Sequence, residues 1–238
     1  MAGVIYFKQY GAQRSGTNYL KRLIELNFKD VTVFGSILGW KHGMYETGNG
    51  TKFTCDSHEE WIDKQIKPDG KVASVDRFPL KYTPEELREA CKELKYLISV
   101  KDPYSYVLSF KNFRAKRRDW NKDQVDRWLT EYLTSYNTWG DLNKRHPDRC
   151  YIIRYDLLLS NRDSILSSIQ SKFNLQRKEN PFIDEPRKVN ASTDHGLLIS
   201  KSKFDRDYYI EKKYMLELPE DIIDMITSRL QKWHLARC

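Results

Sequence analysis

This chain of 238 residues has little cysteine and no long hydrophobic run. No stretch approaches the roughly 20 apolar residues of a membrane-spanning helix. No charged and then apolar leader opens the sequence, because the first apolar run begins almost at Met1. The four cysteines lie apart without a C-x-x-C pair, which disfavours a zinc site and favours reduced thiols; they are Cys55, Cys91, Cys150 and Cys238. We therefore expect a cytoplasmic protein with no transmembrane segment.

Internal repeats and low-complexity segments are also missing, which excludes a repeat array. Hydrophobic residues make up 39% of the chain and charged residues 31%, as in ordinary globular proteins. The length suits one α/β domain, so we predict a single domain over residues 1–238. The net charge of +8 suits an anionic ligand, an acidic polymer or nucleic acid, and does not choose among them.

Short apolar runs alternate with segments of helical periodicity along most of the chain. We predict strands at 4–7, 31–34, 72–75, 96–100 and 151–154. We predict helices over 20–28, after a capping box at Thr83, after Pro103, over 123–143, over 165–173 and after Pro219. Residues 180–207 have no periodicity, and we predict a loop long enough to be a functional lid. The fold class is α/β, with a doubly wound, mostly parallel central sheet flanked by helices.

Residues 10–20, with the sequence YGAQRSGTNYL, are the most informative segment. They join a predicted strand to a predicted helix, so backbone N–H groups and a helix N-terminus surround a place where an anion can bind. Gly11 and Gly16 have the spacing of the nucleoside-triphosphate P-loop, G-x-x-x-x-G-K-[ST]. Thr17 and Asn18 stand where that motif has Lys and Ser or Thr. The loop therefore fits a phosphate-linked group bound without the lysine and the magnesium ligand of an ATPase.

The positive charge of this loop lies inside it, at Arg14. The core Arg-Ser-Gly-Thr, at 14–17, resembles the 5′-phosphosulfate-binding loop of sulfotransferases, [KR]-[ST]-G-[ST]. These enzymes use 3′-phosphoadenosine 5′-phosphosulfate (PAPS) as donor and release adenosine 3′,5′-bisphosphate (PAP). The segment KDPYSYVLS, from Lys101 to Ser109, resembles the family's 3′-phosphate site, [RK]-[DN]-P-x-x-x-x-x-S. A third segment, at 154–158, is similar to the family's Y-E-D-L but lacks the glutamate.

The resemblance implies a P-loop-like sulfotransferase architecture and a set of donor-binding residues. Arg14 would stabilise the charge that develops on the oxygen between sulfur and phosphate. Lys101 and Ser109 would bind the 3′-phosphate, which distinguishes PAPS from ATP, and no metal is implied. The backbone N–H groups that would hold the 5′-phosphosulfate are those around Ser15, Gly16, Thr17 and Asn18.

A base must take the proton of the acceptor, and histidine is the usual choice near neutral pH. Of the five histidines, His42 lies next to Lys41, just past the second predicted strand. Many sulfotransferases have a K-x-H-x-P pattern; this chain departs from it, and its closest segment, VDRFP at 75–79, has no histidine. We predict His42 as the base and Lys41 as a second cation on the sulfuryl oxygens. His195, in the long polar loop, is the second candidate for the base.

No motif in the sequence identifies the acceptor. We expect a hydroxyl or amine of a carbohydrate or small molecule, bound by loops at 35–70, 111–121 and 180–207. Trp40 is a candidate for stacking on adenine, for lining the cleft or for plain packing. The basic side chains of the long loop are candidates to close over the 3′-phosphate, as C-terminal loops do in this family; they are Arg187, Lys188, Lys201 and Lys203.

A basic run with interleaved aromatic residues follows the 3′-phosphate motif. It fits a solvated helix end, a nucleic-acid patch or a cleft for an anionic acceptor, and nucleic acid is disfavoured because no nucleic-acid-binding motif accompanies the run. Its members are Lys111, Phe113, Arg114, Lys116, Arg117, Arg118 and Trp120.

Two other classes of function stay open. One is a non-catalytic basic adaptor that binds a nucleotide or nucleic acid on a degenerate P-loop scaffold. The other is a nucleotide or small-molecule kinase with an unusual P-loop. The absent Gly-Lys-[ST] counts against the kinase, and the pairing of Lys101 with Ser109 counts against the adaptor.

Overall fold

The computed structural model describes residues 3–35, 37–39, 41–42, 58, 62–63, 82–114, 120–184, 187–193, 196–203 and 205–235. At 113–114, 187–193, 196–203 and 234–235 the description covers the backbone. The predicted strand at 72–75 lies outside these residues.

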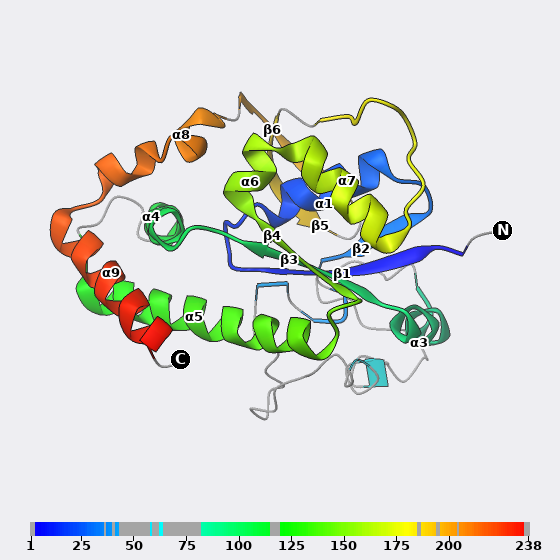
Figure 1. Cartoon of the computed structure of the whole chain (residues 1–238), viewed down its shortest axis with the longest axis horizontal. Helices are drawn as coiled ribbons and strands as arrows, with labels where there is room; N and C mark the ends of the chain where they lie inside the picture. The colour runs from blue at the N-terminus through cyan, green and yellow to red at the C-terminus, as the bar shows by residue number, and fades with distance from the viewer. Residues whose placement is uncertain are drawn as a thin grey trace.

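The core of the fold is a parallel sheet of four strands in the order β2-β1-β3-β4. Each neighbouring pair is parallel, so all four carboxyl ends meet at one edge. The predictions of an α/β class and a parallel central sheet are therefore confirmed (Figure 1). The strands are β1 (Ile5–Gly11), β2 (Val31–Phe34), β3 (Lys95–Val100) and β4 (Cys150–Arg154).

Helices cover both faces of this sheet (Figure 1). One face packs on α1 (Thr17–Asn27), α6 (Tyr155–Ser160) and α7 (Arg162–Phe173), and the other on α3 (Pro84–Lys92) and α5 (Lys122–Arg145). Strand β3 serves both cores because successive side chains alternate: Leu97 packs on the first face, and Tyr96 and Ile98 pack on the second. The doubly wound arrangement follows from this alternation.

Local signals fixed two helix starts that we predicted. Before α3, the Thr83 amide donates to Glu86 Oε2 over 2.7 Å, and the Glu86 amide donates to Thr83 Oγ1 over 3.2 Å, which completes the predicted capping box. At α5, Asn121 Oδ1 accepts from the Gln124 amide over 3.0 Å. The long helix predicted over 123–143 is thus confirmed, with ends that differ by one or two residues.

The remaining helices lie beyond the carboxyl ends of the strands (Figure 1). They are α4 (Pro103–Arg114), α8 (Asp207–Ile210), the 3-10 helix η2 (Lys213–Glu217) and α9 (Glu220–Leu235). The predictions of helices after Pro103 and after Pro219 are confirmed. In the part of the chain that the structure describes, no helix combines the length and apolar character needed to cross a membrane.

The prediction of an unstructured loop over 180–207 was wrong. This segment contains an antiparallel hairpin of β5 (Arg187–Thr193) and β6 (Gly196–Lys203), and β5 lies against α1. The sequence of β5, RKVNAST, has only two apolar residues, Val189 and Ala191. Two small apolar residues give a weak alternating pattern, so this strand is defined by its pairing with β6 more than by its local sequence.

Candidate functional site

The two predicted phosphate-binding motifs meet at the carboxyl edge of the sheet. Gly11, the last residue of β1, pairs with Ser99 of β3, and Val100 pairs with Arg154 of β4. The loop after β1, the segment after β3 and the start of α6 are therefore adjacent. This is the edge at which open α/β sheets bind their ligands.

The loop after β1 turns sharply and packs against α6. Arg14 and Gly16 both have positive φ, of 66° and 78°, in the left-handed region. A side chain at position 16 is excluded in any case, because a Cβ there would lie 2.1 Å from Cε2 of Tyr155. Helix α1 begins at the next residue, with no acidic side chain in its first turn. Its N-terminal amides, which have no acceptor inside the helix, border a place suited to an anion.

Buried polar side chains fix the backbone of this loop. Gln9 Nε2 donates to the Thr17 carbonyl over 2.6 Å, and Ser99 Oγ donates to the Ser15 carbonyl over 2.5 Å. Gln9, Ser15 and Ser99 are fully buried. Since the donors come from β1 and β3, the loop is held by the sheet itself.

Lys101 is a buried cation at the end of β3, with 2% of its surface exposed. Its Nζ donates to Ser109 Oγ over 2.7 Å and to the Arg14 carbonyl over 3.1 Å. Nζ also lies 4.9 Å from the ring centre of Tyr209 and 5.6 Å from that of Tyr155. Within the described ranges, no carboxylate is paired with it.

The electrostatics of Lys101 follow from this environment. Burial, and after it repulsion from the Arg14 guanidinium, lowers the pKa of Lys101 to about 7, while Asp102 acts in the opposite direction. A buried ammonium group without a carboxylate is best stabilised by an anion that arrives from outside. The structure thus brings together Lys101, Ser109 and the Arg14 loop, as the sequence predicted.

Lys41 and His42 lie against the same loop from the side of β2. The Gly11 amide donates to the Lys41 carbonyl over 3.0 Å, and Lys41 Nζ donates to Asn18 Oδ1 over 2.5 Å. His42 Nδ1 lies 2.7 Å from the Gly11 carbonyl oxygen, so we assign the ring proton to Nδ1 and the lone pair to Nε2. Burial and then the Lys41 charge lower the pKa of His42 to about 3, so the ring is neutral at pH 7.

Sequence reasoning missed Lys8, which supports the segment that contains Lys41 and His42. Lys8 is fully buried in β1, and its Nζ donates to the carbonyls of Gly35, Ile37 and Gly39 over 2.6, 2.8 and 2.5 Å. The ammonium group thereby holds the turn that leads to Lys41. A lysine in the middle of the apolar run IYFKQY was the signal that could have drawn attention to it.

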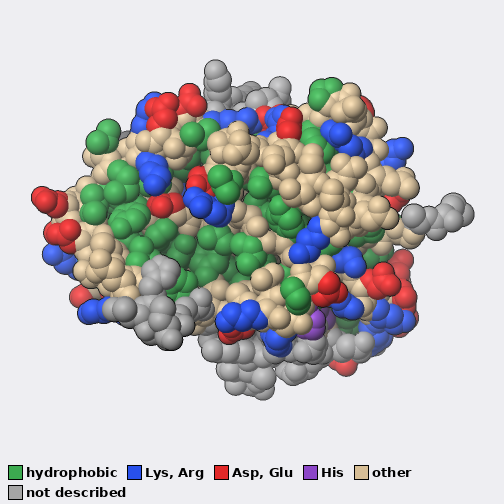
Figure 2. Space-filling view, viewed as in Figure 1, with side chains coloured by type: hydrophobic (Ala, Val, Ile, Leu, Met, Phe, Trp, Pro, Cys, Tyr) green, Lys and Arg blue, Asp and Glu red, His purple; other side chains and the backbone are tan. Residues whose placement is uncertain are grey.

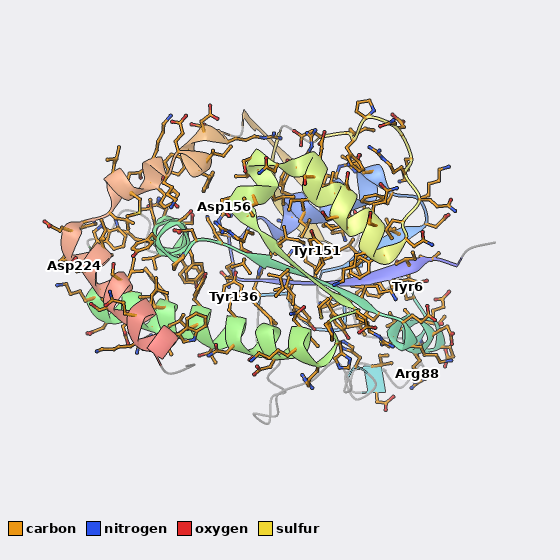
Figure 3. All side chains as sticks on the ribbon, viewed as in Figure 1. Tyr6, Arg88, Tyr136, Tyr151, Asp156 and Asp224 are labelled. Carbon is orange, nitrogen blue, oxygen red and sulfur yellow. The ribbon has the colours of Figure 1, made fainter. Side chains whose placement is uncertain are left out.

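Sequence reasoning also missed the roles of two tyrosines of α5. The Tyr132 hydroxyl donates to the Lys101 carbonyl over 2.5 Å, and the Tyr136 hydroxyl donates to the Ser99 carbonyl over 2.9 Å. Figure 3 shows Tyr136 between α5 and the sheet. These phenols therefore hold the end of β3 from the face opposite to α6.

Several predicted candidates lie outside the described residues. These are Trp40, His195 and residues 115–119 of the basic run, together with the side chains of the four hairpin cations and of Phe113 and Arg114. Of that run, Lys111 is described, and its Nζ lies 4.6 Å above the ring of Trp120. Figure 2 shows basic and acidic side chains interspersed on the visible face.

Comparison with known proteins gives a structural likeness. No protein-family model matches the sequence, and no curated protein matches it. The sulfotransferase domain from the Synechococcus PCC 7002 olefin synthase is similar with a TM-score of 0.50 and 14% identity, covering 97% of this chain and 96% of that domain. The sulfotransferase domain from the curacin biosynthetic pathway has a TM-score of 0.48 and 15% identity, covering 97% and 98%. At these identities the likeness concerns the fold, and the chain has the fold of sulfotransferase domains.

Proposed function

We propose that the protein is a PAPS-dependent sulfotransferase that transfers a sulfuryl group to a hydroxyl or amine of a carbohydrate or small molecule. The observation that carries this proposal is the buried Lys101 ammonium group. It is hydrogen-bonded to Ser109 and to the Arg14 loop, and it has no carboxylate partner among the described residues. A 3′-phosphate beside the 5′-phosphosulfate loop would complete this environment.

The residues present fit a donor with two phosphate-type groups. Position 16 has no room for a Cβ, so the loop backbone lies close against Tyr155. The first turn of α1 has no acidic side chain to repel a 5′-group. Lys101 and Ser109, which are bonded to each other, would bind the 3′-phosphate. PAPS, when bound, supplies the sulfuryl group and a good leaving group.

The chain's own residues supply positioning, charge and a proton acceptor. Arg14 is exposed beside the loop, and its guanidinium suits the negative charge that develops there during transfer. Lys41 Nζ, held by Asn18, is a second cation beside the first turn of α1. Nε2 of His42 is the atom we assign to receive the acceptor proton, since the Gly11 carbonyl fixes the proton on Nδ1. We propose that these cations make a metal unnecessary.

Thermal unfolding with nucleotides tests the proposal. A ligand that binds only the folded state raises the midpoint by an amount set by its concentration and dissociation constant. We expect PAP to give a large shift, 5′-AMP a smaller one and ATP with magnesium little. A shift with ATP and magnesium alone would instead identify a kinase, and no shift with any of the three would contradict nucleotide binding at this loop.

The low pKa of His42 favours a second candidate function, a nucleotide-binding protein without catalysis. A histidine with a pKa of about 3 is a weak base. Both candidates predict PAP binding, so turnover separates them. Incubation with [³⁵S]PAPS and pooled glycans and metabolites should label an acceptor in the wild type and not in the His42→Gln variant. Equal labelling by both proteins would show that His42 is not the base.

A further inference from the structure

One hydroxyl group contacts both phosphate-binding motifs. The Tyr136 hydroxyl donates to the Ser99 carbonyl over 2.9 Å at the end of β3. The amide of Ala12, in the loop after β1, points to the same oxygen over 3.5 Å, and the amide of Lys101 does so over 3.4 Å. A single atom of α5 is therefore shared by the 5′-loop and by the backbone of the 3′-phosphate motif.

The position of this hydroxyl is fixed by the packing of its ring. Tyr136 lies between Tyr132 and Trp139, with ring centres 4.4 and 5.0 Å away in edge-to-face arrangements. Both neighbours are buried side chains of the same helix. Burial raises the pKa of Tyr136 above its ordinary value, so the hydroxyl keeps its proton and remains a donor.

The two motifs are also tied to each other directly. Ser99 Oγ donates to the Ser15 carbonyl over 2.5 Å, and Lys101 Nζ donates to the Arg14 carbonyl over 3.1 Å. These bonds and the Tyr136 hydroxyl connect the same two backbone segments. Together they fix how far the first turn of α1 lies from the Lys101 ammonium group.

We propose that Tyr136 is a positioning residue that sets the separation between the 5′-loop and the Lys101 site, and that it thereby selects ligands carrying both a 3′- and a 5′-phosphate. The inference rests on the proposed function. Tyr136 acts through Ala12, Ser99 and Lys101 and needs no contact with the ligand. A two-phosphate ligand gains from its second contact only when the spacing of the two subsites is held in advance.

Titration of purified full-length protein with PAP and with 5′-AMP by calorimetry tests this inference. The quantity of interest is the ratio of the 5′-AMP dissociation constant to the PAP dissociation constant. We expect Tyr136→Phe to lower this ratio about tenfold and to change 5′-AMP affinity less than about threefold, since the hydroxyl makes bonds to both motifs. A general loss of stability would weaken both ligands together.

Tyr96→Phe is the matched control. Tyr96 is buried in the same core, near the start of β3, where its ring stacks on Tyr10 and its hydroxyl lies 3.3 Å from His58 Nε2. The substitution keeps the ring and removes only this hydroxyl. We expect this variant to keep the wild-type ratio. Ser99→Ala, which removes the bond to the Ser15 carbonyl, should lower the ratio in the same direction. If Tyr136→Phe does not fold, an unchanged ratio in Ser99→Ala overturns the inference, because the spacing of the two motifs would then not select the ligand.

The outcomes separate this inference from the proposed function. If the wild type binds PAP no more tightly than 5′-AMP, the proposed function fails and the inference fails with it. If the wild type prefers PAP and Tyr136→Phe keeps the full preference, the inference alone is overturned. An equal loss in Tyr96→Phe would overturn it too, because the effect would then come from a loosened core.

Discussion

Lys8 and Lys101 are both almost completely buried beside the same sheet, and their surroundings differ. Lys8, in the middle of β1, donates to three backbone carbonyls that belong to one turn. Lys101, at the end of β3, has one carbonyl and one hydroxyl as acceptors and two aromatic rings beside it. The exposed fractions of the two side chains, 0% and 2%, are nearly equal. The two lysines differ instead in the number and kind of their hydrogen-bond acceptors. We therefore assign a structural role to Lys8, whose ammonium group is surrounded by carbonyls, and propose Lys101, which has fewer acceptors, as the ligand-binding group.

The largest effect on stability is expected from Lys8→Met. Methionine fills a similar volume but leaves the three carbonyls of the turn without their donor. We expect the free energy of unfolding to fall by about 3 kcal/mol, because buried carbonyls are left unpaired. Urea denaturation followed by circular dichroism measures this. Unchanged stability would show that the carbonyls find other donors, and it would contradict the structural role of Lys8.

Lys101→Met should behave in the opposite way. Removing a buried charge without a carboxylate partner leaves the stability of the ligand-free protein unchanged or raises it. PAP affinity should fall about a hundredfold, since charge-assisted hydrogen bonds to the 3′-phosphate are lost. Affinity for 5′-AMP serves as the internal control and should stay near the wild-type value. A loss of stability as large as that of Lys8→Met would mean that both lysines are structural.

The pH dependence of PAP binding sharpens the comparison further. With a pKa of about 7, Lys101 is half charged at pH 7 in the ligand-free protein, and a phosphate favours its charged form. PAP affinity should therefore fall about fivefold from pH 7 to pH 8, with proton uptake on binding. Calorimetry in buffers of different ionisation enthalpy measures that uptake. Lys101→Arg, which stays charged, should remove the dependence; a pH-independent wild type would contradict a neutral fraction of Lys101.

The free energy of unfolding of the ligand-free protein should rise with pH, whereas PAP affinity falls. The folded pKa of Lys101 is lowered from 10.5 to about 7, so between these values the unfolded chain binds more protons at this side chain. The contribution of Lys101 to the free energy of unfolding therefore rises as the pH increases from 7 toward 10.5. Comparing the pH profiles of wild type and Lys101→Met isolates this contribution. Identical profiles would contradict it.

A smaller effect than that of Lys101→Met is expected from Ser109→Ala. The serine hydroxyl accepts from Lys101 Nζ and is itself a candidate donor to the 3′-phosphate. We expect PAP affinity to fall about fivefold, as for one hydrogen bond, with little change in stability. Ser160→Ala, which removes a helix-surface hydroxyl bonded to the Asp156 carbonyl, is a control that should leave PAP affinity unaltered. Equal affinities in wild type and Ser109→Ala would exclude this hydroxyl from the site.

Much of the fold, and the meeting of the two motifs of the candidate site, could be predicted because the signals were local. The capping box at Thr83 and the apolar stripe of α5 lie within one element each. Lys101 and Ser109 are only eight residues apart in the sequence. The passage from β3 into α4 brings their side chains together. Motifs that follow β1 and β3 meet because parallel strands end at the same edge.

What could not be predicted depends on contacts between distant parts of the chain. Lys8 bonds to carbonyls 27 to 31 positions away, and their convergence arises from the turn after β2. Tyr136 bonds to Ser99 across 37 positions and to Ala12 across 124. In the sequence Tyr136 resembles an ordinary helix position, and Lys8 stands out only as a charged residue inside an apolar run. The hairpin of β5 and β6 was missed for a related reason, since its strands are defined by their pairing.

A crystal structure of the complex with PAP tests the central claim most directly. We expect the 3′-phosphate within hydrogen-bonding distance of Lys101 Nζ and Ser109 Oγ, with the 5′-phosphate on the backbone amides that begin α1. A bisphosphate bound elsewhere, or bound with its 3′-phosphate away from Lys101, would contradict it.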